Sequence, residues 1–170
     1  KVISLYNLDE EYLGVELDRT AFFPQGGGQT SDVGTLQVVG SDQKILVENV
    51  EICGEHLFHF VENSEENVKN LRIGAVLHGE IDWKKRFSDM QQHSGEHILS
   101  GVVHRLYGYD NVGFHLSQTE VTVDFNGVLE ESDICKVEDL VNEAVWQNLK
   151  IHAWFPSQAE LSTLLYRSKK

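Results

Sequence analysis

The apolar residues of this chain change their spacing at Trp83. Before that point, short segments alternate apolar with polar residues and are separated by Gly, Asn or Asp, which is typical of strands joined by turns. Five segments are predicted as strands: residues 12–18, 34–39, 44–52, 56–62 and 75–82. Several short strands in succession predict a small β-barrel over residues 1–83.

After Trp83 the spacing becomes helical. Residues 85–107 carry apolar side chains at intervals of three, four and seven from Ile98 onward, and Gly108 is placed to end the helix. Further helices are predicted over 132–149 and from Ser157 to the end of the chain, and further strands over 121–125 and 150–155. The fold class is therefore predicted as α+β, with an α/β two-layer unit over residues 84–170 following the barrel.

Composition narrows the function classes. No apolar run approaches the roughly 20 residues that a membrane helix needs, so no membrane partner is expected. The net charge of −13 counts against a nucleic-acid partner, although Lys84, Lys85 and Arg86 leave room for a basic patch. The start of the chain lacks the features of an export signal, which predicts a cytoplasmic location and reduced cysteines, with Cys135 buried as a small apolar residue.

Two histidines four residues apart, His93 and His97, are the first candidate site. On a helix such residues lie on one face, so both imidazoles are able to bind the same zinc ion. With Glu96 they form the H-x-x-E-H pattern of inverted zinc proteases, and the alternative is two solvated histidines on the polar face of a helix. Cys53 and His56 form a C-x-x-H between predicted strands, which is interpreted as an ordinary turn.

The second candidate is a glycine-rich loop upstream. Gly26, Gly27 and Gly28 permit positive φ and a close approach of a ligand to the backbone. Gln29 follows immediately with an amide that both donates and accepts hydrogen bonds. Alone, such a loop is a weak signal, and the alternative is a flexible hairpin.

Together the two motifs are more specific. The pattern T-x-F-F-P-x-G-G-G-Q-x-x-D-x-G over residues 20–34, followed by M-x-x-H-x-x-x-H over 90–97, resembles the editing domain of alanyl-tRNA synthetase and the free-standing alanyl-tRNA editing proteins of the AlaX group. The segments 111–127 and 155–170 are similar to that group as well. The resemblance implies a β-barrel followed by an α/β editing domain, a tRNA partner, and hydrolysis of the ester bond in alanine tRNA mischarged with serine or glycine.

The resemblance also implies residue roles. His93 and His97 would bind Zn²⁺, and Gln29 would hydrogen-bond the substrate over the loop formed by Gly26, Gly27 and Gly28. Glu96 is assigned to a supporting or general-base role, or otherwise to the surface. His115 is a candidate lining residue of the pocket, and Thr30 or Thr20 is a candidate reader of the serine hydroxyl.

One departure from the group stands out, because the C-x-x-x-H that supplies its remaining two zinc ligands is missing. The chain is therefore expected to be a segment of a longer protein, with those ligands beyond residue 170 and oligomerisation through the region that follows. Two alternatives remain. One is a non-catalytic tRNA-binding module of the same fold. The other is a zinc protease, which would use Glu96 as base but gives Gln29 and the glycine loop no role.

Overall fold

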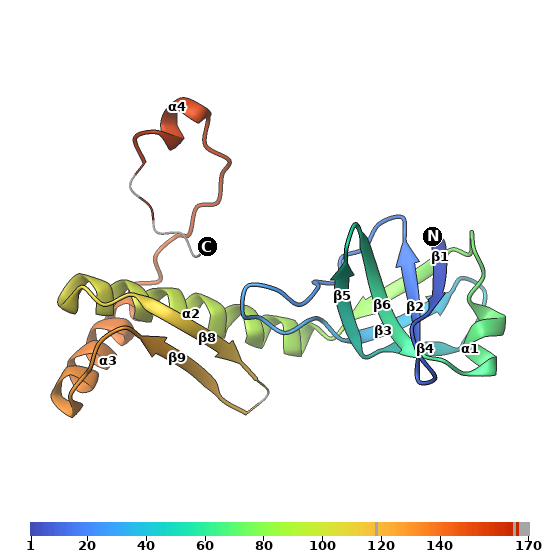
Figure 1. Ribbon diagram of the computed structural model, residues 1–170, viewed down its shortest axis with the longest axis horizontal. Helices are drawn as coiled ribbons and strands as arrows, with labels where there is room; N and C mark the ends of the chain where they lie inside the picture. The colour runs from blue at the N-terminus through green and yellow to red at the C-terminus, as the bar shows by residue number, and fades with distance from the viewer. Residues whose placement is uncertain (118, 165, 167–170) are drawn as a thin grey trace.

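The computed structural model describes residues 1–117, 119–164 and 166, and its strands are antiparallel throughout. Two sheets form one end of the molecule, which we call the β lobe (Figure 1). In hydrogen-bonded order, the first contains β1 (Val2–Asn7), β2 (Tyr12–Leu17), β6 (His56–Glu62) and β5 (Asn49–Cys53). The second contains β4 (Lys44–Val47), β3 (Gly34–Val38) and β7 (Leu77–Ile81), and a short helix, α1 (Glu65–Asn70), follows β6.

The barrel predicted for residues 1–83 is wrong in one respect, because the two sheets do not close into one ladder within the described residues. The predicted strand 44–52 is divided at Glu48, where the backbone leaves β3 and donates to Phe60 of β6. At the opposite edge only isolated hydrogen bonds join the sheets, including one from Val2 N–H to the carbonyl of Ala75. The sheets therefore enclose a common core without completing a barrel.

That core takes apolar side chains from both sheets. Alternate residues of each strand point inward, so the period-2 pattern of the sequence becomes a buried face. The fully or almost fully buried residues are Val2, Leu13, Val15, Phe22, Leu36, Ile45, Val47, Val50, Val61 and Leu71.

A long helix, α2 (Trp83–Tyr107), runs from the β lobe to the other end of the molecule (Figure 1). The side chain of Asp82 accepts a hydrogen bond from the backbone of Lys85, which starts the helix two residues earlier than predicted. Gly108, at φ 71°, ends the helix as its spacing predicted. The predicted boundary between residues 83 and 84 falls in its first turn, and the division into two domains stays a prediction.

The second half of α2 packs with β8 (Asn111–Leu116), β9 (Val121–Phe125) and α3 (Glu131–Trp146). We call this end the α/β lobe. Its cluster buries only Val102, Val103 and Val137 fully, with partly buried neighbours such as Leu106 and Leu140. None of the helices within the described residues is both long and apolar enough to cross a bilayer.

Four expectations for the last quarter of the chain are wrong. Helix α3 ends at Trp146 rather than 149, and Cys135 on it is exposed rather than buried. The expected strand over 150–155 is absent because none of the described strands pairs with it, and Ile151 there is 81% exposed. From Ser157 only α4 (Gln158–Leu161) forms, with a capping box between Ser157 and Glu160. The residues 165 and 167–170 of that expected helix lie outside the described residues.

Candidate functional site

The glycine-rich loop forms a tight turn. Gly26 and Gln29 exchange two backbone hydrogen bonds of 3.1 and 3.0 Å, with Gly27 and Gly28 between them at φ 61° and 82°. Positive φ at two successive positions is costly for residues with a Cβ, so glycine is required at both. The turn projects Gln29, whose side chain is buried, toward α2.

An ion pair fastens the loop to α2. The buried carboxylate of Asp32 accepts from the backbone N–H of Phe23 at 2.7 Å, which closes the loop at its base. The guanidinium of Arg86 on α2 binds the same carboxylate through Nε and Nη2, and Nη2 also donates to the carbonyl of Ala21. The hydrogen bond from Arg86 to Asp32 raises the pKa of the guanidinium, so Arg86 stays charged.

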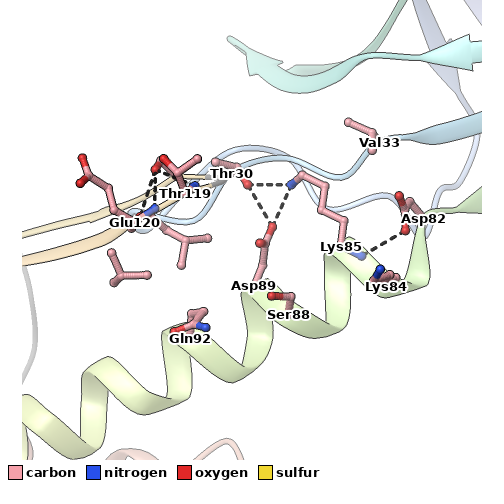
Figure 2. Close-up of a pocket in the computed structure, with 13 residues that line it drawn as sticks. Thr30, Val33, Asp82, Lys84, Lys85, Ser88, Asp89, Gln92, Thr119 and Glu120 are labelled. Atoms are coloured by element: carbon pink, nitrogen blue, oxygen red, sulfur yellow. Dashed lines mark hydrogen bonds and ion pairs between the residues drawn. The ribbon is translucent and has the colours of Figure 1, made fainter.

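A second cluster of charges lies one residue away in the sequence. Lys85 Nζ donates to Thr30 Oγ1 at 2.7 Å, to the carbonyl of Ser31 at 2.8 Å and to Asp89 Oδ2 at 2.8 Å. These three contacts use all three donors of the lysine. The hydroxyl of Thr30 donates in turn to Asp89 at 2.9 Å (Figure 2). These contacts fix the residue that follows Gln29 against the first half of α2.

The turn also contacts the α/β lobe. A Cβ built on Gly28 would lie 2.4 Å from Cδ1 of Phe114 on β8 and 3.0 Å from its carbonyl oxygen. A Cβ on Gly27 would lie 3.8 Å from Cε1 of His93. The loop therefore packs this closely against β8 only because position 28 is glycine, whereas a Cβ on Gly27 would make an ordinary van der Waals contact.

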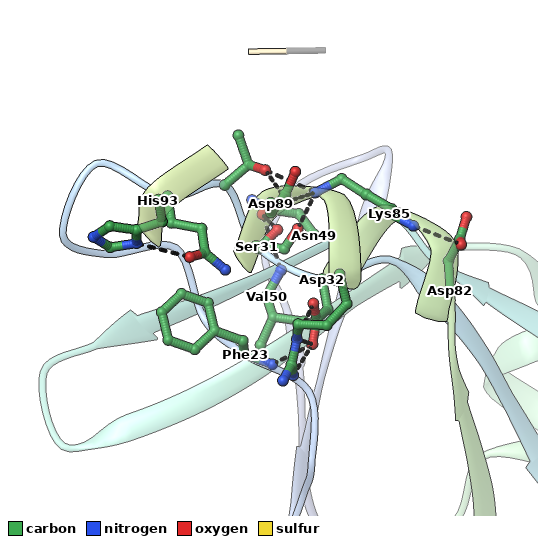
Figure 3. Close-up of polar contacts among 12 residues, drawn as sticks. Phe23, Ser31, Asp32, Asn49, Val50, Asp82, Lys85, Asp89 and His93 are labelled. Atoms are coloured by element: carbon green, nitrogen blue, oxygen red, sulfur yellow. Dashed lines mark hydrogen bonds and ion pairs between the residues drawn. The ribbon is translucent and has the colours of Figure 1, made fainter. Parts of the chain in front are cut away.

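His93 and His97 project from one face of α2, as their spacing predicted, and their ring centroids lie 5.1 Å apart in a stacked arrangement. His93 Nδ1 lies 2.9 Å from Gln29 Oε1 (Figure 3). Since a carbonyl oxygen only accepts, Nδ1 of His93 carries the proton in this contact. The structure thus brings Gln29 and the two histidines together across 64 residues of sequence.

Glu96 is buried, so the alternative assignment of Glu96 to the surface is wrong. Its Oε1 accepts hydrogen bonds from Ser100 on the next turn of α2 and from Asn111 on β8. Its Oε2 lies 3.4 Å from Nδ1 of His97, whose side chain is 64% exposed. The buried carboxylate therefore lies beside Nδ1 of the exposed imidazole.

These contacts bear on metal binding. Ligand atoms of His93, Glu96 and His97 all lie within 4.8 Å of one another, and no other such group of three occurs among the described residues. In each histidine Nδ1 faces a protein oxygen, which is the arrangement that commonly leaves Nε2 for a metal ion. The pair therefore suits a zinc ion, for which two further ligands or waters would complete a tetrahedral set.

A cavity of about 680 Å³ lies on the Lys85 side of α2, and neither Gln29 nor the group of His93, Glu96 and His97 belongs to its lining (Figure 2). Its lining includes Thr30 from the loop, Lys85, Asp89 and Gln92 from α2, and Leu116 and Glu120 from the β8–β9 hairpin. Cavities of this size accept small molecules or the end of a larger one.

The other candidates do not join the site. His115 is exposed and pairs across β8–β9 with Thr122, on the face of β8 opposite to Phe114. The hydroxyl of Thr20 bonds to His59 inside the β lobe. Cys53 and His56 are cross-strand neighbours in the β5–β6 hairpin, so the C-x-x-H is a turn as predicted.

Sequence patterns did not single out several residues that build the site. Lys85 and Asp89 have the i, i+4 spacing of a helical ion pair, which was a usable signal. Asp32 lies in the glycine motif, but nothing in the sequence pointed to Arg86 as its partner. Asn111 and Phe114 gave no signal at all, because their role depends on how β8 packs beside α2.

Comparison with known proteins is consistent with this geometry. The family described as tRNA synthetases class II (A) matches residues 6–85. The chain is 33% identical over 153 residues to an alanine–tRNA ligase of Thermococcus kodakarensis, covering 86% of this chain and 16% of the ligase. It is 35% identical over 144 residues to the alanyl-tRNA editing protein AlaX-L of Pyrococcus horikoshii, covering 84% of this chain and 34% of that protein.

A third relative, the alanyl-tRNA editing protein AlaX-M of Methanosarcina mazei, is 28% identical over 156 residues. That match covers 90% of this chain and 62% of the relative. The chain therefore spans less than two thirds of the length of each of these relatives, while most of its own length is matched.

Proposed function

Because this chain is a homologue of the alanyl-tRNA editing proteins and the alanine–tRNA ligases, we propose that it hydrolyses the ester bond of alanine tRNA mischarged with serine or glycine. The observation that carries the proposal is the 2.9 Å contact between Gln29 Oε1 and His93 Nδ1. It sets the amide of the glycine loop beside the paired imidazoles, as hydrolysis at one site requires. Action on tRNA in the cytoplasm is part of the same proposal, and oligomerisation stays a prediction.

Each side chain has a distinct role in this reaction. Gln29 accepts from His93 through its oxygen, which leaves its NH₂ group to donate to the ester carbonyl of the substrate. His93 and His97 would hold a zinc ion, which supplies a water of lowered pKa or polarises the ester. Glu96 holds His97 in position from its buried site, and the backbone of Gly26, Gly27 and Gly28 admits the substrate closely.

We assign the recognition of the serine hydroxyl to Thr30. Its hydroxyl donates to Asp89 and accepts from Lys85, and a hydroxyl oxygen accepts up to two hydrogen bonds. Thr30 therefore retains the capacity to accept one hydrogen bond from a serine side chain. An alanine ester would leave that contact unmade, so correctly charged tRNA would be the poorer substrate.

Hydrolysis of seryl-tRNA under single-turnover conditions tests the proposal. We expect Gln29→Ala and His97→Ala to lower the rate at least 100-fold, since the first removes a positioned donor and the second a metal ligand. His104→Ala is the matched control, because His104 lies on the same helix, bonded to Asp110, away from the group. Equal rates for all variants would contradict the proposal.

Zinc titration followed by calorimetry tests the metal separately from activity. We expect binding by the unmodified chain and by His104→Ala, and its loss in His93→Ala. Glu96→Gln should weaken binding by about 10- to 100-fold, because it removes the charge that orients His97. Unchanged zinc affinity in His93→Ala would show that the ion binds elsewhere.

A further inference from the structure

An exposed aromatic ridge leads along α2 to the two histidines. Trp83 and Phe87 are 62% and 48% exposed, and their rings stack at a centroid distance of 6.1 Å with an interplanar angle of 24°. Met90, 43% exposed, continues the ridge toward His97. At 100° per residue, Trp83, Phe87, Met90 and His97 fall within about 80° of one another around the helix.

From this arrangement we propose that the ridge formed by Trp83, Phe87 and Met90 binds the unpaired bases at the 3′ end of a tRNA by stacking. The inference rests on the proposed function and adds to it the surface that delivers the acceptor end. Aromatic rings that expose their faces are the usual platform for unpaired bases, because every base has a π face.

The length of the ridge suits this occupant. Trp83 precedes His93 by ten residues, which is about 15 Å along the helix axis. A strand that stacks on Trp83 and Phe87 therefore has a few nucleotides to span before its terminal ribose ester reaches the imidazoles. A duplex end alone would not place bases along this line.

The charge around the ridge is less negative than that of the rest of the chain, which suits a phosphate-bearing partner. The chain has net charge −13, yet residues 83–97 contain three basic side chains, Lys84, Lys85 and Arg86, and two acidic ones. Both acids, Asp89 and Glu96, are buried, and Asp89 is paired with Lys85. The exposed charge of residues 83–97 is therefore that of Lys84, which attracts phosphate, while the exposed Asp82 directly precedes the segment.

Binding of uncharged RNA measures this without relying on hydrolysis. The probe is a fluorescein-labelled acceptor-stem minihelix with a four-nucleotide single-stranded 3′ tail, compared with the same duplex ending blunt. We expect the unmodified chain to bind the tailed probe more tightly. Trp83→Leu and Phe87→Leu should each weaken that binding about fivefold or more, because they remove an aromatic face but keep an apolar side chain.

Two further variants keep the test specific. Trp83→Phe should retain affinity within about twofold because a ring remains for stacking. Trp146→Leu, an equally drastic change at the 80% exposed tryptophan of α3, should have no effect. Melting temperatures of all variants should match, since these side chains are exposed.

Equal binding of tailed and blunt probes by the unmodified chain would overturn the inference. The inference would also be overturned if Trp83→Leu and Phe87→Leu bound the tailed probe as tightly as Trp83→Phe does. That result would indicate that the ridge contacts protein rather than bases. Failure of the proposed hydrolysis has a different signature: normal tail-dependent binding with no release of serine from seryl-tRNA.

Discussion

The two lobes bury their apolar residues to different degrees. In the β lobe ten side chains from two sheets and their connections form one enclosed cluster, with Leu36 and Val15 at 0% exposure. In the α/β lobe the cluster on α2 and α3 buries three valines and covers their neighbours only in part, and Leu116 on β8 is buried outside this cluster. Apolar burial is the main source of stability, so the β lobe is the stiffer of the two.

The difference explains how the candidate site is held. Gln29 comes from the β lobe, and the histidines lie on α2 between the two clusters, so neither core encloses them. Charged contacts hold the site instead, between Asp32 and Arg86 and between Lys85, Thr30 and Asp89. The geometry of the site therefore depends on ion pairs at the junction, more than on packing in either lobe.

Breaking the junction should have the largest effect. Asp32→Ala leaves the guanidinium of Arg86 without its carboxylate and the N–H of Phe23 without its acceptor. Removing one partner of a buried pair costs about 3–5 kcal/mol, which we expect as loss of unfolding free energy in urea. Hydrolysis should fall as well, because the loop that carries Gln29 loses its anchor.

Arg86→Lys separates geometry from charge at the same position. Lysine keeps the charge but cannot bind a carboxylate through two nitrogens, so we expect a smaller loss of stability and a clear loss of hydrolysis rate. A lysine variant with full activity would show that the bidentate contact is unimportant for the site.

A matched pair of leucine substitutions measures the comparison between the lobes directly. Leu36→Ala, fully buried between the two sheets, should lower the unfolding free energy by about 2–5 kcal/mol. Leu140→Ala removes the same atoms from a partly buried position on α3 and should cost about 1 kcal/mol. If the two losses are equal, the α/β lobe is as well packed as the β lobe and the comparison fails.

The sequence predicted this organisation where local pattern decides the outcome. The change of period at Trp83, the stop at Gly108 and the shared face of His93 and His97 all follow from spacing along one element. It failed where a distant partner decides. The division of the strand at Glu48 depends on Phe60, and the burial of Glu96 depends on Asn111 from β8. The segment 150–155 alternates like a strand, but strand formation needs a neighbour, and none of the described strands provides one.

The contact of the glycine turn with Phe114 tests whether the lobes act together. Gly28→Ala places a Cβ at positive φ and 3.0 Å from a backbone oxygen of β8, so the turn or the strand must move. We expect a cost of about 1–3 kcal/mol and a fall in hydrolysis rate larger than that of Gly40→Ala, which has positive φ but open space. Similar effects of the two variants would show that only the backbone strain matters.

Acid should distinguish the lobes by a smaller but selective effect. His59 is fully buried in the β lobe, where Nδ1 donates to the carbonyl of Val15 and Nε2 accepts from Thr20, and it is the one buried histidine among the described residues. Burial lowers the pKa of His59 below its usual 6.5, and the contact with Val15 offsets this only in part. Below pH 6.5 the unfolded chain therefore binds a proton that the folded chain does not. The free energy of unfolding decreases as the pH is lowered, by at most about 1.4 kcal/mol per pH unit. His59→Gln should flatten this slope, and hydrogen exchange between pH 7.5 and 5.5 should show β2 and β6 losing protection before α3. If the free energy of unfolding of the unmodified chain and of His59→Gln changes with pH in parallel, other groups determine the response of the β lobe to acid.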